Sequence, residues 1–252
     1  MLSFLPETLS PMLRGGRFTP IAEGCSPARV YRVTDAAVFP DCFLKIDIPR
    51  PRGLDREAAA CIWLRGRFPA PEVLYFGEAG GNLYLLTTAL TGQGACFGEN
   101  ARQPERMARM LARALSRLHQ LSCADCPLDN SAPALLEYAR TRISPSASDP
   151  EGCSALTLHR ELTAVQPPDE PVFCHGDFCL PNVLFENGEL TGIIDLGDAG
   201  AGNRHLDLSQ CCWSLRHNFG EERFADAFLD EYGRDRVDPG HMKWFSDLYR
   251  FF

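Results

Sequence analysis

The chain has 252 residues, of which 45% are hydrophobic and 23% are charged. These values are ordinary for globular proteins, and they exclude disordered and fibrous architectures. Its 33 Asp and Glu outnumber its 25 Lys and Arg, and the net charge of −8 argues against nucleic acid as the main partner and favours a small cationic molecule. No apolar run reaches the roughly 18 residues of a membrane helix, and the start carries no charged leader. We therefore predict a cytoplasmic protein without membrane partners. We also expect a monomer or a weak dimer.

Eleven cysteines are spread through the chain, many of them in segments that are otherwise apolar. A reducing compartment and buried free thiols explain this distribution more simply than a disulfide framework does. The thiols expected to be buried are those of Cys42, Cys61, Cys174, Cys211 and Cys212. Cys123 and Cys126 form a lone CxxC pair, which lacks the second ligand pair of a structural zinc site. We expect His119 to be a packed or surface residue of a helix.

The first third of the chain is rich in predicted β-strands. Apolar and β-branched residues predict strands over residues 29–33 and 38–48, separated by turn residues. A helix is predicted over residues 54–68, because its apolar positions share one face and Pro69 ends it. A hairpin follows, with strands over residues 73–77 and 82–90.

Helical periodicity replaces the strand pattern after Gly92. The spacing of apolar residues predicts an amphipathic helix over residues 105–121. Its buried face is expected to contain Met107, Leu111, Ala114 and Leu118. Residues 144–151 have the composition of a loop, and a short helix is predicted over residues 156–165. The chain therefore divides into residues 1–91 and 92–252.

The segment His175-Gly176-Asp177, with Asn182 five residues after the Asp, lies between two apolar strands. In the kinase loop H-R-D-x-x-x-x-N, the Asp engages the acceptor hydroxyl and the Asn binds magnesium. Asp195 ends the next apolar strand, where a second metal-binding carboxylate is expected. Phosphoryl transfer requires a positioned carboxylate and hard oxygen ligands for Mg²⁺. We therefore predict Asp177 as the catalytic residue and Asn182 with Asp195 as metal ligands.

An Asp- and Asn-rich turn that only caps local backbone is the alternative for each acid taken alone. Three such residues at this spacing favour a functional site. His175 is expected to hold the loop through hydrogen bonds rather than to act as a base.

Lys45 lies inside an apolar strand, where a charge is unfavourable unless it has a partner. Glu57 in the following helix is the expected partner, as the strand Lys and helix Glu are in kinases. The alternative is an exposed strand Lys with an exposed helix Glu. The turn Gly24-Cys25-Ser26 could direct backbone N–H groups toward phosphates, which makes Ser26 a further candidate.

These motifs, in this order, resemble the aminoglycoside phosphotransferase family, and within it the 3′-phosphotransferases most. The resemblance runs from about Ile21 to Phe252. The segments that carry it are Gly24-Cys25-Ser26, Leu85-Leu86-Thr87-Thr88-Ala89, Leu118-His119 to Cys126-Pro127, His175 to Asp207, and Phe251-Phe252.

The resemblance implies an α+β, protein-kinase-like fold with two lobes. A small β-rich lobe, residues 1–91, would clamp the nucleotide, and a larger, mainly helical lobe, residues 92–252, would carry catalysis and acceptor binding. ATP or GTP would lie near the backbone of Thr88, Ala89 and Leu90. With Mg²⁺ bound, the γ-phosphate would be transferred to a hydroxyl of an aminoglycoside, with the 3′-hydroxyl as the leading candidate.

The acceptor-binding half departs from the family pattern. The relatives end in a sequence like L-L-D-E-F-F, whose acids face the amino groups of the drug, whereas Tyr249 and Arg250 stand at those two positions here. The candidates left for contacting the acceptor are Asp149, Glu151, Asp198 and Phe252.

The sequence has three alternative interpretations. A kinase of the same fold acting on another amino- or sugar-alcohol metabolite is the main alternative. A nucleotide-binding module without turnover would lack Lys45, Asp177 or Asp195, and all three are present. A protein kinase is disfavoured, because Gly176 replaces the Arg of H-R-D and Leu-Gly follows Asp195 where protein kinases have Phe-Gly.

Overall fold

The computed structural model describes residues 5–21, 27–143, 150–168 and 170–252, with side chains of 150–153 left out. The chain forms two compact units, Met1–Thr91 with Thr191–Gly197, and Gly92–Leu190 with Asp198–Phe252. The predicted division placed all of residues 92–252 in the second part. In the structure, the short stretch Thr191–Gly197 belongs instead to the first unit.

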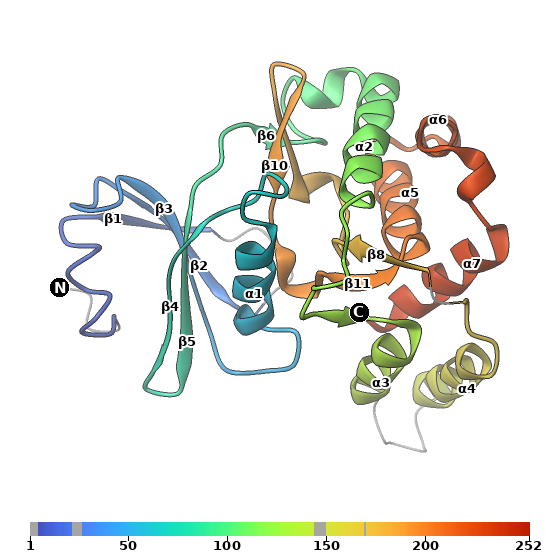
Figure 1. Ribbon diagram of the computed structural model, residues 1–252, viewed down its shortest axis with the longest axis horizontal. Coiled ribbons are helices and arrows are strands. Elements are labelled where there is room, and N and C mark those ends of the chain that lie inside the picture. Colours follow the sequence, from blue (N-terminus) through green and yellow to red (C-terminus); the bar gives the residue numbers. More distant parts are fainter. Residues whose placement is uncertain (1–4, 22–26, 144–149, 169) are drawn as a thin grey trace. The chain divides into compact units, whose positions relative to one another are not determined.

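The first unit is an antiparallel sheet with one helix (Figure 1). Its strands follow the order β1-β2-β3-β5-β4. They are β1 (Arg17–Ile21), β2 (Arg29–Thr34), β3 (Asp41–Asp47), β4 (Val73–Ala79) and β5 (Asn82–Thr88), and the helix is α1 (Leu54–Leu64). The β-rich character predicted for this part of the chain is confirmed.

The two faces of this sheet have different partners, because successive residues of a strand point to opposite sides. Leu44 and Ile46 of β3 lie in a core cluster with Leu9 and Leu13 of the N-terminal segment. Leu54 and Ala58 of α1 pack against Leu83 and Leu85 of β5 in a second cluster. Lys45, between Leu44 and Ile46, is thereby directed toward α1.

Three details of this unit differ from the prediction. Strand β3 begins at Asp41 rather than residue 38, because the Asp35 N–H donates to the Pro40 carbonyl at 2.9 Å and closes a loop there. Helix α1 ends at Leu64 rather than residue 68, and Gly66 has φ +73°, a conformation that terminates helices. Strand β1 was not predicted.

The second unit contains most of the helices (Figure 1). They are α2 (Pro104–Leu118), α3 (Ala132–Arg142), α4 (Pro150–Ala164), α5 (His205–Phe219), α6 (Glu222–Tyr232) and α7 (Pro239–Leu248). The strands are β6 (Gln93–Gly94), β7 (Asp129–Asn130), β8 (Pro171–Cys174), β9 (Val183–Glu186), β11 (Gly200–Asn203) and the start of β10 (Glu189–Ile193), whose last three residues belong to the first unit. Within the described residues, no helix has both the length and the apolar character needed to cross a membrane.

The short strands form two three-stranded sheets, ordered β10-β9-β6 and β7-β11-β8. Strand β11 runs parallel to β7 and antiparallel to β8. Helix α5 packs against α6 and α7, and α2 packs against α6. A core cluster joins α3, α7 and β8 through residues that include Leu135, Phe245 and Cys174. This core fixes the end of β8, after which the predicted catalytic loop begins.

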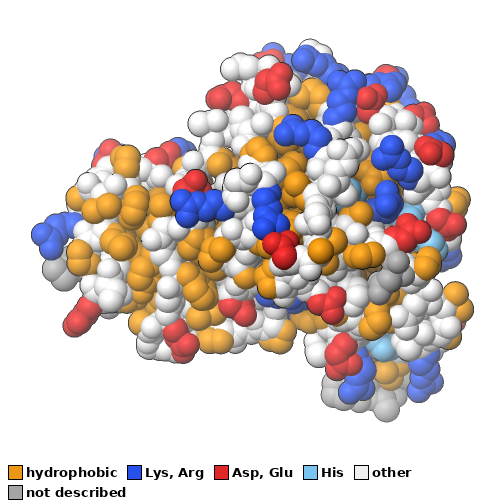
Figure 2. Space-filling view, viewed as in Figure 1, with side chains coloured by type: hydrophobic (Ala, Val, Ile, Leu, Met, Phe, Trp, Pro, Cys, Tyr) orange, Lys and Arg blue, Asp and Glu red, His pale blue; other side chains and the backbone are white. Residues whose placement is uncertain are grey.

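Helix α2 confirms the predicted amphipathic pattern, since Met107, Leu111, Ala114 and Leu118 are all buried. Helix α4 begins at Pro150, six residues before the predicted start. Basic side chains gather over α2 with acidic ones among them (Figure 2). Arg109 pairs with Glu105 and Glu231, and Arg113 pairs with Glu231. The arginines of α2 are thus partly neutralised.

The five cysteines predicted to be buried are buried. Burial raises the pKa of the Cys42 thiol to about 11 and that of Cys61 to about 12, so these thiols are protonated at neutral pH. The Cys123 thiol donates to the Pro171 carbonyl, and the Cys126 thiol donates to that of Leu128.

A buried histidine begins helix α5. His205 donates through its backbone N–H and Nδ1 to Asn203 Oδ1, at 3.0 and 2.7 Å, and its Nε2 accepts from the Asp238 N–H at 2.9 Å. Burial, followed by the charges of His241 and Arg204, lowers the pKa of His205 from 6.5 to about 4. The folded protein therefore holds His205 in its neutral form.

We expect this histidine to make stability depend on pH. The unfolded chain takes up a proton below about pH 6.5, whereas the folded chain does so only near pH 4, so stability is full above pH 6.5 and declines toward pH 4. The contribution of this group at pH 5 should be about 2 kcal/mol smaller than at pH 7.5. Urea unfolding at both pH values, on the parent and on His205→Gln, measures it. An equal pH dependence in the two proteins would contradict the assignment.

Candidate active site

The predicted catalytic loop follows β8 and ends in a 3₁₀ turn, Leu180–Asn182. Asn182 Nδ2 donates to the carboxylate of Asp177 at 2.9 Å and to its carbonyl at 3.1 Å. The Asp177 N–H donates to His175 Nδ1 at 3.2 Å, which confirms that His175 holds the loop by hydrogen bonding. The structure thus brings Asp177 and Asn182 together as the sequence predicts, with Asp177 half-buried.

Gly176 explains why this loop has no Arg before its Asp. Its φ is +82°, and a Cβ at this position would lie 1.9 Å from the carbonyl oxygen of Asp198. That oxygen accepts a hydrogen bond from Asn130 Nδ2 at 2.6 Å, so it is fixed in place. A residue with a side chain would clash with backbone and adopt a disfavoured conformation. The loop therefore packs directly against the segment that contains Asp198.

Helix α5 binds the backbone of the catalytic loop through three side chains, which are spaced three and four residues apart. The carboxylate of Asp207 accepts from the backbone N–H groups of His175 and Gly176, both at 2.8 Å. Gln210 accepts from the Phe178 N–H and donates to the Gly176 carbonyl, and Ser214 Oγ accepts from the Leu180 N–H at 3.0 Å. Side chains at such spacings share one helix face. Five backbone groups of the loop are satisfied in this way.

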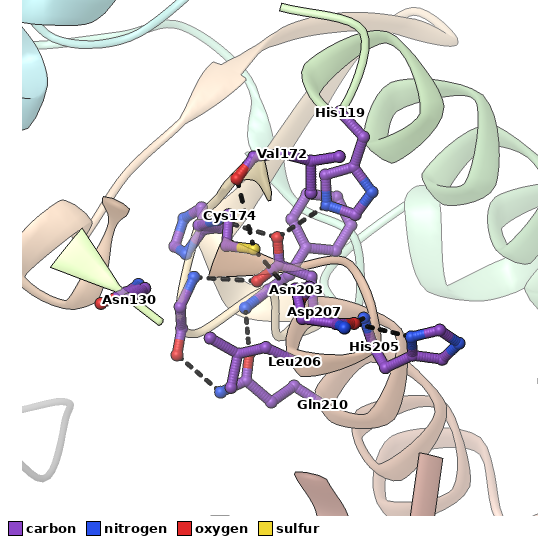
Figure 3. Close-up of polar contacts among 12 residues, drawn as sticks. His119, Asn130, Val172, Cys174, Asn203, His205, Leu206, Asp207 and Gln210 are labelled. Carbon is purple, nitrogen blue, oxygen red and sulfur yellow. Dashed lines mark hydrogen bonds and ion pairs between the residues drawn. The ribbon is translucent and has the colours of Figure 1, made fainter. Parts of the chain in front are cut away.

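Asp207 is also the centre of a buried side-chain network (Figure 3). His119 Nε2 contacts Asp207 Oδ2 at 3.0 Å, and His119 Nδ1 contacts the hydroxyl of Tyr232 at 2.8 Å. The sequence predicted His119 to be either a packed or a surface residue of a helix. The structure shows the packed environment, at the end of α2.

Ligand-type atoms of His119, Cys174 and Asp207 lie within 4.8 Å of one another. The Cys174 thiol donates to the Asn203 carbonyl at 3.4 Å, and burial raises its pKa well above the usual value. The thiol is therefore protonated, and both His119 nitrogens are in hydrogen bonds. We interpret the cluster as a structural network that anchors the loop.

The first unit contains a second group of predicted residues. Lys45 Nζ lies 2.7 Å from Glu57 Oε1 and 2.5 Å from Asp195 Oδ1. The predicted Lys45–Glu57 ion pair is confirmed, and its alternative as an exposed pair is wrong, because the two side chains are only 18% and 8% exposed. Burial alone would lower the pKa of Lys45, but the charges of Glu57 and Asp195 outweigh it and raise the pKa. Lys45 is therefore a permanent cation.

Asp195 has an uncommon backbone conformation and an accessible carboxylate. Its φ is +66°, which is rare outside glycine and occurs mostly where surrounding structure enforces it. Its side chain is 54% exposed, so the carboxylate remains accessible while one oxygen contacts Lys45.

The segment predicted to contact the nucleotide follows β5. Thr88 is engaged within the unit, since its N–H donates to the Glu72 carbonyl and its hydroxyl accepts from the Glu72 N–H. Ala89 and Leu90 make no backbone hydrogen bond with any described part of the chain.

The structure places two of the four candidate acceptor-binding residues, Asp198 and Phe252. Asp198 lies against Gly176 of the catalytic loop. Phe252 stacks on Tyr138 with ring centroids 5.4 Å apart. Ser26, Asp149 and the side chain of Glu151 lie outside the described residues, so the structure does not place them.

Two sets of site residues were not predicted. Tyr249 donates to Asp177 Oδ1 at 3.2 Å, across 72 residues of sequence. The side chains that bind the loop from α5 were also missed. Their signal is that Asp207, Gln210 and Ser214 recur at spacings of three and four among the apolar residues of a mostly buried helix.

An antiparallel sheet with a Lys–Glu pair, followed by a helical unit with an Asp-x4-Asn loop, defines a kinase-like phosphotransferase. The chain belongs to the phosphotransferase enzyme family, whose sequence model matches residues 17–245.

Individual relatives match nearly the whole chain. It is 34% identical to an aminoglycoside 3′-phosphotransferase of Niallia circulans, over 98% of this chain and 97% of that one. It is 33% identical to a streptomycin 3″-kinase of Streptomyces griseus, over 96% of each. Among solved structures, it resembles an aminoglycoside 3′-phosphotransferase of type VIII with a TM-score of 0.81, 30% identity and 97% coverage of both chains. The predicted family and fold class are confirmed.

Proposed function

We propose that this protein transfers the γ-phosphate of a nucleoside triphosphate to a hydroxyl of an aminoglycoside and so confers resistance to that antibiotic. The 3′-hydroxyl is the leading candidate for the acceptor. The observation that carries the proposal is the loop in which Asn182 and Tyr249 hold the two carboxylate oxygens of Asp177. The 34% identical relative supports the acceptor class by its name.

In this proposal, Asp177 orients the acceptor hydroxyl and accepts its proton. Phosphoryl transfer proceeds through a loose transition state, in which positioning contributes more than covalent chemistry. A carboxylate whose two oxygens already contact donors from Asn182 and Tyr249 has a defined orientation. Helix α5 fixes the backbone beneath it.

Lys45 would bind the phosphates of ATP or GTP, and the backbone of Ala89 and Leu90 would contact the base. Asn182 Oδ1 and the accessible carboxylate of Asp195 fit Mg²⁺ as hard oxygen donors. When bound, the ion would neutralise charge on the transferred group. A related aminoglycoside phosphotransferase from Streptomyces rimosus has been solved with ADP and streptomycin, which supports a nucleotide donor.

Lys45→Met is expected to raise the KM for nucleotide about tenfold or more, with a smaller change in the acceptor KM. The reason is that a phosphate-binding cation is lost. Because this change removes the positive charge beside the buried Glu57, we also specify the double variant Lys45→Met/Glu57→Gln, which removes both charges. The double variant should recover thermal stability but not nucleotide KM. A larger effect on the acceptor KM would contradict the assignment.

A streptomycin 3″-kinase activity is the second candidate, because that relative is almost equally similar. One experiment separates the candidates. Purified protein is assayed for nucleotide consumption with kanamycin, with a matched aminoglycoside lacking the 3′-hydroxyl, with streptomycin, and with non-antibiotic amino alcohols and sugars. We expect turnover with kanamycin and none with the 3′-deoxy compound. Turnover only with streptomycin would favour the second candidate, and turnover only with a metabolite would overturn the aminoglycoside assignment.

A further inference from the structure

A row of aromatic side chains adjoins Asp177 within the second unit. We define the aromatic row as Tyr249, Trp213 and His217. The ring centroids of Tyr249 and Trp213 are 6.2 Å apart, and Trp213 stacks on His217 at 4.9 Å with an interplanar angle of 9°. The row begins at the hydroxyl that donates to Asp177 and continues along helix α5.

The hydroxyl of Tyr249 stays protonated and so remains a hydrogen-bond donor. Burial, followed by the charge of Asp177, raises the pKa of Tyr249, so its proton stays in place at neutral pH. Asn182 contacts Oδ2 of Asp177, and Tyr249 contacts Oδ1. Opposed donors on the two oxygens restrict rotation of the carboxylate. Removal of one donor would widen the range of orientations from which Asp177 meets an acceptor hydroxyl.

Trp213 offers an accessible ring at a fixed place. It is 48% exposed, whereas the described tryptophans Trp63 and Trp244 are each 8% exposed. The next residue, Ser214, accepts from the Leu180 N–H, so this part of α5 is bound to the catalytic loop. The ring is therefore held in register with Asp177.

Two carboxylates close in sequence to the aromatic row are already paired. Asp247 contacts Lys243 at 2.6 Å, and Glu222 is bound by Arg216 through both of its oxygens. Arg250 is exposed and has no ion pair within the described residues. Neither of these two carboxylates is therefore left unpaired to bind a protonated amine. The face of an indole ring attracts such a cation, and its apolar surface also packs against a sugar ring.

We propose that the aromatic row is an acceptor subsite, in which the ring of Trp213 packs on a protonated amino sugar and Tyr249 positions Asp177 toward its hydroxyl. This inference rests on the proposed function, since it assigns part of the acceptor site of the same reaction. Such a subsite would use contacts with aromatic rings in place of the two acids expected at positions 249 and 250.

The two roles predict effects on different kinetic constants. Trp213→Leu should raise the acceptor KM about tenfold, more than it changes kcat, and Trp213→Phe should restore much of the loss. Tyr249→Phe keeps the ring and removes the hydroxyl, so it should lower kcat about tenfold with a smaller change in acceptor KM. Phe76→Leu, which alters another exposed aromatic residue, should change neither constant. Equal effects of the Trp213 and Tyr249 variants on both constants would overturn the proposal.

Binding separates failure of this inference from failure of the proposed function. Kanamycin is titrated into the parent protein while tryptophan fluorescence is recorded, and calorimetry gives Kd for the parent and both Trp213 variants. We expect a fluorescence change that is lost in Trp213→Phe and a Kd about tenfold weaker in Trp213→Leu. Kanamycin turnover by the parent with unchanged affinity in Trp213→Leu would overturn the inference alone. If the parent binds kanamycin through Trp213 but does not phosphorylate it, the proposed function fails and the subsite remains. Absence of binding would overturn both.

Discussion

Asp177→Asn is expected to lower kcat by about 10²-fold or more, with little change in the KM for nucleotide. Asparagine keeps the shape of the side chain, and its oxygen can still accept from Tyr249 or Asn182, but it cannot accept the proton of the acceptor hydroxyl. The effect should therefore be on turnover and not on folding. Single-turnover kinetics with the acceptor identified in the panel measures it.

The matched control is Asp226→Asn, the same chemical change at an exposed carboxylate that contacts Arg234. Its kcat should equal that of the parent. If Asp177→Asn also retains near-normal kcat, Asp177 is not the catalytic residue and the loop has a structural role only.

Asp207→Asn is expected to reduce the free energy of unfolding by about 3 kcal/mol. The carboxylate is fully buried and accepts from two backbone N–H groups while contacting His119. Asparagine has one acceptor oxygen, and its NH₂ group would face one of these donors. A buried donor left without an acceptor is unfavourable, and hydrogen bonds to charged groups are among the stronger ones.

Urea unfolding of the two proteins measures this change, again with Asp226→Asn as control. The control should differ from the parent by less than about 1 kcal/mol, because exposed ion pairs contribute little. A similar small change for Asp207→Asn would show that the buried network is not needed for stability.

The local parts of the site could be predicted from the sequence, and the distant parts could not. Asp177 and Asn182 belong to one loop, and Lys45 and Glu57 lie on consecutive elements, so spacing and polarity were sufficient. Tyr249 is separated from Asp177 by most of the C-terminal helices. No periodicity relates these positions, and only the packing of α7 and α5 brings them together.

Helix α2 was predicted from its single apolar face, whereas helix α5 was missed because its burial is more even. Helix α2 has a clear apolar face, and its prediction was close to the observed bounds. Helix α5 is buried on most sides and carries polar residues that bind the loop, so its apolar pattern is interrupted. The polar residues with which α5 binds the loop are therefore also the reason why the helix was not predicted. Helices α3, α6 and α7 were likewise expected only through the resemblance to a helical lobe.

The assignment of Thr191–Gly197 to the first unit has a consequence for how the chain can be divided. A fragment comprising residues 1–91 would lack the stretch that supplies Asp195 to Lys45. On the ribosome, this unit cannot be completed until roughly four-fifths of the polypeptide has been made. Genetic truncation or proteolysis at residue 91 should therefore yield an incomplete product, and split versions of the protein would need a breakpoint after residue 197.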